Sequence, residues 1–152
     1  NTRLVGSEMC IRDREYVKQL LQGKFPAAPK FSVMISHVKD IAKAHVLSLK
    51  NKSAGGRRLI VGSEVRSILE LSQIMAKNIP SHAKKLPKRE LPNFMVKLLS
   101  YIDTSAKNMV PDLGLKMQTD QRYAEEILQM KFIASEIAVV DAAKSVIRLN
   151  LA

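Results

Sequence analysis

The feature of the sequence that most constrains its fold is an alternation of amphipathic segments with short apolar ones. Residues 17–21, 38–49 and 68–75 carry apolar side chains at three- and four-residue steps, the period of an amphipathic helix. Residues 31–36 and 57–62, which lie between them, are short, rich in apolar side chains and typical of strands. The order helix, strand, helix, strand, helix predicts an α/β fold with parallel strands.

Local signals mark where two of these helices begin or end. Gly23 follows the first helix, in the position that glycine prefers just beyond a helix C-terminus. Ser67 and Glu70 form a Ser-x-x-Glu capping box at the start of the third helix.

The second half of the sequence is predicted to be mostly helical. Pro92 suits the first turn of a helix over residues 92–103, on which Phe94 belongs to an apolar stripe that we expect to pack within a lobe. Thr119 is a candidate N-cap for the next helix, and residues 135–149 carry one more amphipathic pattern. We therefore expect the end of an α/β sheet followed by a small, mostly helical lobe.

Residues 1–14 follow neither pattern. From Leu4 to Arg14 they read LVGSEMCIRDR, and back-translation of this stretch in one frame matches the transposon-end adapter used to tag DNA for sequencing. We interpret residues 1–14 as an adapter-derived artefact and residues 15–152 as the natural segment. On this interpretation, we expect the chain to be the C-terminal piece of a longer protein.

Composition excludes several classes of protein. The hydrophobic content of 46% is sufficient for a packed core, and no run approaches the roughly 18 apolar residues of a membrane span. Cys10 is the single cysteine and lies in the segment interpreted as an artefact. Without it there are no disulfides or cysteine-ligated metal sites, which suits a cytoplasmic location.

The formal net charge of +11 raises the alternative of a stand-alone basic module that binds nucleic acid. Lysine and arginine are concentrated only in HAKKLPKRE, where Lys84, Lys85, Lys88 and Arg89 stand close together. No aromatic residue is interleaved there for base stacking. We therefore favour a solvated basic surface and expect no nucleic-acid partner.

Four stretches resemble the C-terminal part of an extended short-chain dehydrogenase/reductase. They are LLQGKFPAAPK, ISHVKDIAKAHVLSL, AGGRRLIVGSEVRSILELSQIM and LGLKMQTDQRYAEEILQMKF. The second is similar to the strand-to-helix motif H-V-x-D-[VIL]-A of the NAD-dependent epimerase/dehydratase family, and the third to its G-x-R-[FY] strand and following helix. Within that family the chain most resembles the branch of dihydroflavonol reductases and related aldehyde reductases.

This resemblance implies the last strands of a Rossmann-like parallel sheet together with a substrate-binding lobe. It also implies a parent enzyme that reduces an aldehyde or ketone with NADP or NAD, and a small carbonyl compound as its substrate. A sugar-nucleotide epimerase or dehydratase of the same family is the further alternative.

The residues that perform this chemistry in the family are missing from the sequence. The six glycines form no glycine-rich phosphate-binding turn. Tyr16, Tyr101 and Tyr123 are not followed four residues later by lysine, so no Tyr-x-x-x-Lys pair exists. We therefore assign no catalytic, cofactor-binding or metal residues, and expect the chain to be inactive alone.

Phe25, Pro26 and Lys30 are the candidate substrate-binding residues. By resemblance, they lie in a loop that runs near the substrate cleft.

His37 and Asp40 stand at the start of the second predicted helix, either as an acid–base pair or as a structural junction. We favour the junction, because such residues commonly cap helices. His45 falls on the apolar face of the same helix, which predicts a hydrogen-bonded core histidine rather than a metal ligand.

Overall fold

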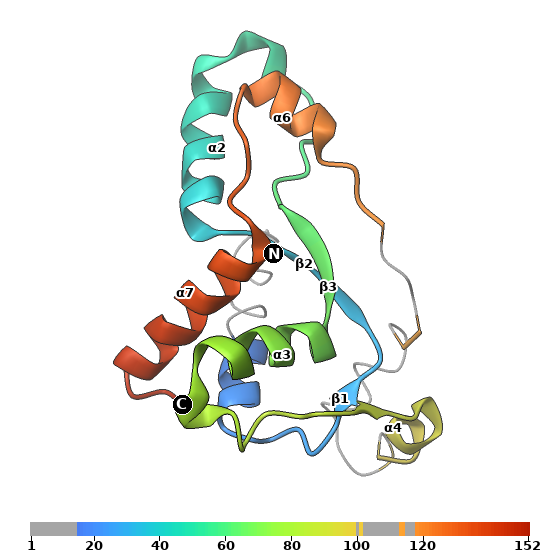
Figure 1. The fold of residues 1–152 in the computed structure, drawn as a ribbon. Helices are drawn as coiled ribbons and strands as arrows, with labels where there is room; N and C mark the ends of the chain where they lie inside the picture. The colour runs from blue at the N-terminus through green and yellow to red at the C-terminus, as the bar shows by residue number, and fades with distance from the viewer. Residues whose placement is uncertain (1–14, 100, 102–112, 115–117) are drawn as a thin grey trace.

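The computed structural model describes residues 15–99, 101, 113–114 and 118–152. A helix over residues 15–21 comes first. The elements that follow are β1 (Ala28–Pro29), β2 (Ser32–Ile35), α2 (Val38–Lys50), the 3-10 turn η1 (Lys52–Ala54), β3 (Glu64–Ser67), α3 (Ile68–Asn78), the 3-10 turn η2 (Pro80–His82), β4 (Glu90–Leu91), α4 (Asn93–Leu99), α6 (Arg122–Leu128) and α7 (Ser135–Arg148). In Figure 1, α2 and α6 form the upper part of the molecule, and α3, α7 and the first helix form the lower part.

The strands form two short ladders, and the α/β class expected from the sequence is confirmed. β1 pairs in parallel with β4, Ala28 opposite Glu90. β2 pairs with β3 in the antiparallel direction, with Ser32 opposite Ser67. The predicted parallel strands are therefore present only in the pair β1 and β4, whereas β2 lies in an antiparallel pair. The chain returns beside β2 only after Gly62, where the amide of Ser63 donates to the carbonyl of Ile35 (2.9 Å).

The predicted strand over residues 57–62 is also wrong, because the structure assigns this segment neither helix nor strand and it belongs to no ladder among the described residues. Its side chains at Leu59 and Val61 pack into a small hydrophobic cluster instead. Gly62 passes so close to β2 that an added Cβ would lie 2.8 Å from the Met34 side chain.

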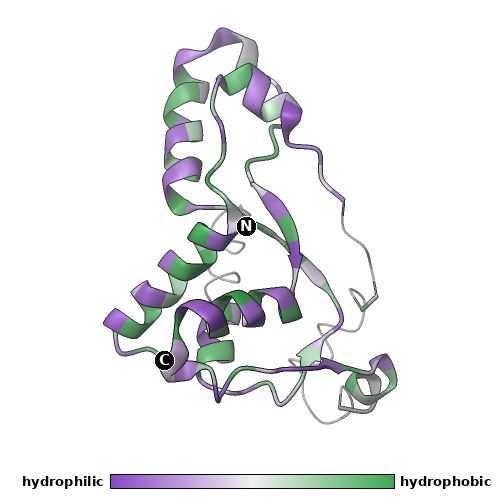
Figure 2. Cartoon of the chain, in the orientation of Figure 1, coloured by the Kyte–Doolittle hydropathy of each residue, from purple (hydrophilic) through white to green (hydrophobic). Residues whose placement is uncertain are grey.

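The main hydrophobic core lies in the lower part of the molecule. It joins the first helix, β1, α3 and α7, and its most deeply buried side chains belong to Leu20, Leu21, Ile68, Met75 and Val146. Figure 2 shows apolar and polar residues alternating around α3 and α7, as their sequence period requires. This core holds together segments from both ends of the described chain.

A smaller cluster, the upper core, lies between α2, η1 and α6. Ala44, Ala54, Leu128 and Met130 are its buried residues. The side chain of Asn51 ties η1 to α6 by donating to the carbonyl of Ile127 (2.5 Å). The upper core therefore fixes α2 against the segment that leads to α7.

The sequence-based prediction of which face of α2 is buried is wrong. The helix buries Asp40 and Ala44, whereas Val46 and Leu49 of the predicted apolar face are exposed, Leu49 by 89%. His45 shares that face and is exposed; its Nδ1 lies 2.7 Å from the carbonyl oxygen of Ile41. The helical period located the helix correctly but did not reveal which side the rest of the chain would cover.

Most local boundary signals agree with the structure. Gly23 has a positive φ of 73°, as expected of a residue just past a helix C-terminus, and both hydrogen bonds of the Ser67–Glu70 capping box are present. The helix predicted after Pro92 begins at Asn93, and its later residues lie outside the described chain. The predicted N-cap at Thr119 is wrong, because α6 begins at Arg122.

Candidate functional site

His37 is the N-cap of α2 and is almost fully buried. The amide of Lys39 donates to its Nδ1 (3.1 Å), so that nitrogen carries no proton in the capping arrangement. The other ring nitrogen, Nε2, lies 3.3 Å from a carboxylate oxygen of Asp141 on α7. The imidazole therefore joins the start of α2 to the middle of α7.

Asp40 lies in the first turn of the same helix and is equally buried. Its Oδ2 accepts a hydrogen bond from the amide of Ile133 (2.7 Å), in the segment that leads into α7. The position also suits a carboxylate because the amides of the first helical turn point toward it. His37 and Asp40 thus bond with their side chains to the α7 region, which favours a structural junction over an acid–base pair.

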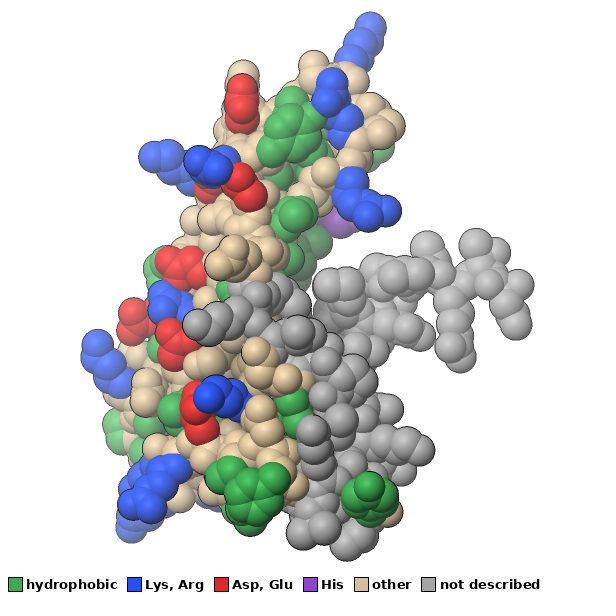
Figure 3. All heavy atoms as spheres, turned by 90° about the vertical axis from the view of Figure 1, so that its right-hand side faces the viewer, with side chains coloured by type: hydrophobic (Ala, Val, Ile, Leu, Met, Phe, Trp, Pro, Cys, Tyr) green, Lys and Arg blue, Asp and Glu red, His purple; other side chains and the backbone are tan. Residues whose placement is uncertain are grey.

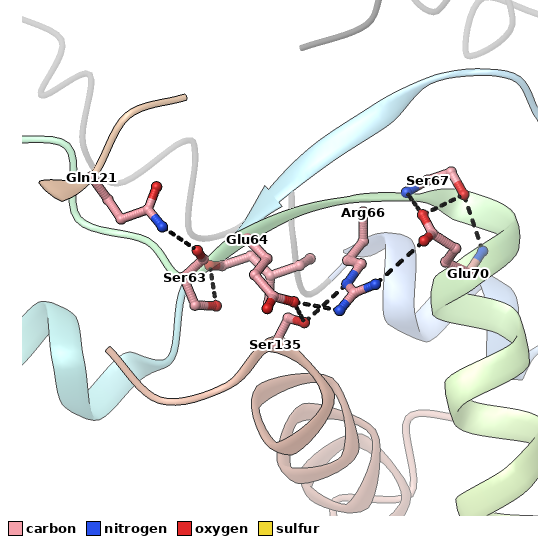
Figure 4. A network of polar contacts seen from close by, with 8 residues as sticks. Ser63, Glu64, Arg66, Ser67, Glu70, Gln121 and Ser135 are labelled. Carbon is pink, nitrogen blue, oxygen red and sulfur yellow. Dashed lines mark hydrogen bonds and ion pairs between the residues drawn. The ribbon is translucent and has the colours of Figure 1, made fainter. Parts of the chain in front are cut away.

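A second polar cluster centres on Arg66 of β3 (Figure 4). Its guanidinium forms ion pairs with Glu64 and with Glu70 (3.4 Å), and donates from Nε to the hydroxyl of Ser135 (3.1 Å). Ser135 donates in turn to Glu64 (2.6 Å). The cluster therefore connects β3 with the first residues of α3 and α7. Sequence analysis identified only its capping box, since the other contacts join distant segments.

The carboxylates of this cluster are held in their charged form. The hydroxyl of Ser135 and then Arg66 lower the pKa of Glu64 below its ordinary value of 4.5. The backbone amide of Ser67 is the main cause of the lowered pKa of Glu70. A lowered pKa makes both groups poor general acids near neutral pH, which fits a structural role.

The three candidate substrate-binding residues lie in different surroundings. Phe25 is half-buried and packs against the main core, and Pro26 is exposed. Lys30 is exposed at the end of β1, with its Nζ 4.0 Å from Glu90 Oε2. The structure therefore leaves Pro26 and Lys30 accessible to a ligand, while Phe25 contributes mainly to the core.

Lys30 lines an open groove in which it meets the residues that lead into α4. The other lining residues are Glu90, Leu91, Pro92, Asn93 and Phe94. The ring of Phe94 is 70% exposed, although the sequence predicted it to pack within a lobe. Met95 and Tyr101 are also exposed, and Figure 3 shows hydrophobic side chains at the lower end of this face. We take the groove as the candidate functional site.

The described residues contain no group of three or more histidine, cysteine, aspartate or glutamate side chains arranged to hold a metal ion. Within the same part of the chain, no helix is both long and apolar enough to cross a bilayer.

Several solved structures resemble this chain. The chain has the fold of the C-terminal part of Rossmann-like reductases. It matches a reductase engineered for asymmetric catalysis with 25% sequence identity and a TM-score of 0.61, covering 88% of this chain and 35% of that one. Two further matches, below 25% identity, support the fold alone.

One of these is yeast Gre2, a methylglyoxal/isovaleraldehyde reductase in complex with NADPH, with 21% identity and a TM-score of 0.62 over 90% of this chain and 40% of that one. The other is gox2253, with 17% identity and a TM-score of 0.69 over 91% and 44% of the two chains. The chain thus spans less than half the length of these structures. No protein-family model and no curated protein matches the sequence.

Proposed function

We propose that this chain is the substrate-side part of an NAD(P)H-dependent oxidoreductase that reduces an aldehyde or a ketone. The observation that carries the proposal is the shared fold with a reductase at 25% identity over most of this chain. Gre2, which was solved with NADPH, supports NADP as the cofactor of the whole enzyme. A dihydroflavonol reductase-like substrate is the narrower form of the same proposal.

The groove at the start of α4 is the part of the chain that would meet the substrate. The exposed ring of Phe94 provides an apolar surface for the hydrocarbon part of a carbonyl compound. The ammonium of Lys30, which also lines the groove and lies 4.0 Å from the Glu90 carboxylate, offers a donor for a polar substituent. These residues bind and orient, and none of them transfers a proton to the carbonyl.

The nicotinamide cofactor supplies the hydride when it is bound. The described residues do not offer it a site: the sequence has neither a glycine-rich turn nor a Tyr-x-x-x-Lys pair. The chain alone should therefore neither bind NADPH nor reduce carbonyls.

The decisive experiment reads the source DNA upstream of the codons for GKFPAAPK. A glycine-rich fingerprint followed by Tyr-x-x-x-Lys supports the proposal, whereas a start codon near Glu15 without a Rossmann unit contradicts it. Titration of the purified chain with NADPH, followed by cofactor fluorescence, is an independent test. We expect no binding, and tight stoichiometric binding would show that the cofactor site lies within this chain.

The groove can be tested in the complete enzyme. Lys30→Met should raise KM for a carbonyl substrate with a polar substituent and leave kcat nearly unchanged, because the lysine binds without entering the chemistry. Lys88→Met is the matched control, since Lys88 is exposed but does not line the groove. An unchanged KM in Lys30→Met would remove this residue from the substrate site.

A further inference from the structure

The basic segment between η2 and β4, residues 84–89, is fixed to the body of the molecule while its charges stay at the surface. We call it the basic loop, and its four cationic side chains are all exposed: Lys84, Lys85, Lys88 and Arg89. Leu86, among them, is buried in the main core. The hydroxyl of Ser72 on α3 donates to the carbonyl of Pro87 (2.9 Å). The core therefore holds the backbone that carries these four charges.

α4 follows the basic loop by way of β4 and brings apolar side chains to the surface. Val96 is buried with 2% of its surface exposed, whereas Phe94 and Met95 before it are 70% and 42% exposed. Tyr101, just beyond the helix, is 88% exposed. The burial of Val96 fixes the first turn of α4 with Phe94 and Met95 outward. Large apolar side chains gathered at the surface in this way mark an interaction surface.

The basic loop and the start of α4 lie at the same end of the molecule. Phe94 follows Arg89 by five positions, so their Cα atoms cannot be more than about 18 Å apart. Lys30 adds a further cation, because it lines the same groove as Phe94. The one carboxylate of residues 84–95 is that of Glu90, and it lies 4.0 Å from Lys30 Nζ. Figure 3 shows lysine or arginine side chains beside hydrophobic ones at this lower end.

We propose that the basic loop and the first turn of α4 form a docking surface for an anionic membrane. A bilayer with acidic lipids has negative headgroups directly above an apolar layer, which matches cations beside Phe94, Met95 and Tyr101. Surface attachment strengthens both with the apolar area that is buried and with the attraction to anionic lipids. It requires no spanning helix, and it does not depend on the proposed reductase activity.

The end of α2 also combines exposed apolar and basic side chains, but it suits an anionic surface less well. Leu49 is 89% exposed and is followed by the exposed Lys50. However, α6 packs with α2 around the upper core and carries Glu125 and Glu126, whose charges an anionic membrane repels. The end of α2 therefore provides matched control positions for the docking surface.

The first test is density-gradient flotation of the 152-residue chain with vesicles of equal parts phosphatidylserine and phosphatidylcholine. The chain should float with these vesicles and not with phosphatidylcholine alone, and added salt should weaken the binding. No flotation with the anionic vesicles, or equal flotation with both kinds, would overturn the proposal. Binding of single-stranded DNA without flotation would assign the basic loop to nucleic acid and equally overturn it.

The need for the basic loop is tested by removing two of its cations. Each lysine or arginine near an anionic surface contributes about fivefold in affinity, so Lys88→Gln combined with Arg89→Gln should weaken binding roughly 30-fold. Lys50→Gln combined with Lys52→Gln removes the same charge elsewhere and should weaken binding by less than about threefold. Equal losses in the two double variants would overturn the docking surface, because net charge alone would then explain the binding.

Contact of α4 with lipid is tested by fluorescence, because the chain contains no tryptophan. Phe94→Trp places a single indole at the proposed contact, and its emission should shift to shorter wavelength when anionic vesicles are added. Leu49→Trp is the matched control and should not shift. No shift in Phe94→Trp, or an equal shift in both variants, would overturn the proposal. A blue-shifted Phe94→Trp that needs only a higher protein concentration would assign the surface to a second copy and also overturn it.

Discussion

The replacement of Asp40 by alanine tests whether the start of α2 is a structural junction or a catalytic pair. The carboxylate is buried and accepts the amide of Ile133 at 2.7 Å. A hydrogen bond to a charged group contributes about 1.5–3 kcal/mol, and a carboxylate in the first turn of a helix adds about 0.3–1 kcal/mol. Asp40→Ala should therefore lower the free energy of unfolding by roughly 2–4 kcal/mol.

The assay is urea unfolding followed by circular dichroism, supported by thermal melting. For a domain of this size, 1 kcal/mol corresponds to about 2–4 °C in Tm, so the expected loss is roughly 4–16 °C. Asp40→Asn keeps an acceptor and should lose less than half as much. Asp141→Ala is the control on the other side of the junction, where the carboxylate is 53% exposed and its loss should cost about 1 kcal/mol or less.

The result that would refute this reasoning is a stability of Asp40→Ala equal to or above that of the parent chain. Replacing a catalytic residue often leaves the free energy of unfolding unchanged or raises it, because active sites are arranged at the expense of stability. An unchanged Tm would therefore return the acid–base interpretation of His37 and Asp40 to consideration.

Three further predictions follow from local geometry. Gln129 ends α6 with a positive φ of 48°, a backbone conformation in which the Cβ of a side chain causes strain and glycine has none. Gln129→Gly should therefore raise the free energy of unfolding, measured by chemical denaturation, by about 1 kcal/mol. A variant that is less stable than the parent chain would contradict this. Glu70→Gln should flatten the pH dependence of the free energy of unfolding. Because the pKa of Glu70 in the folded chain is lower than its ordinary value of 4.5, its charge stabilises the folded chain at pH values above 4.5. This stabilisation is lost as the pH falls through the lower pKa of the folded state. Parallel curves for the two proteins below pH 4.5 would refute the assignment. Gly62→Ala should lower Tm, because the added Cβ would lie 2.8 Å from the Met34 side chain. Combining it with Met34→Ala should restore part of the loss. A Tm of Gly62→Ala equal to that of the parent chain would show that the Met34 side chain moves aside freely.

The features predicted correctly from sequence depend on neighbours along the chain. The capping box of Ser67 and Glu70 needs residues three apart, and the positions of α2, α3 and α7 follow from a period of three to four residues. Gly23 marks a helix end for a reason that lies in its own backbone conformation. Each of these signals depends on only a few neighbouring residues, so contacts with distant parts of the chain did not override them.

The errors concern what covers a segment. The apolar period of α2 was correct, but the buried face is that of Ala44, because α6 and η1 pack there. The antiparallel return of β3 beside β2 depends on the path of the chain after Gly62, which composition does not encode. The contact of His37 with Asp141 spans 104 residues. Lys30, named from family resemblance, lines the candidate groove and its role in binding stays a prediction, whereas the exposure of Phe94 was not predicted.

The main core has a consequence for how the chain folds while it is being synthesised. Leu20 and Leu21 of the first helix belong to the same core as Val139, Ala143 and Val146 of α7, at the far end of the sequence. A ribosome that adds about 5–20 residues per second needs roughly 6–25 s to pass from one group to the other. During that interval the core that contains the first helix lacks the side chains that α7 contributes. We therefore expect the nascent chain to depend on chaperone binding until the last helix leaves the ribosome.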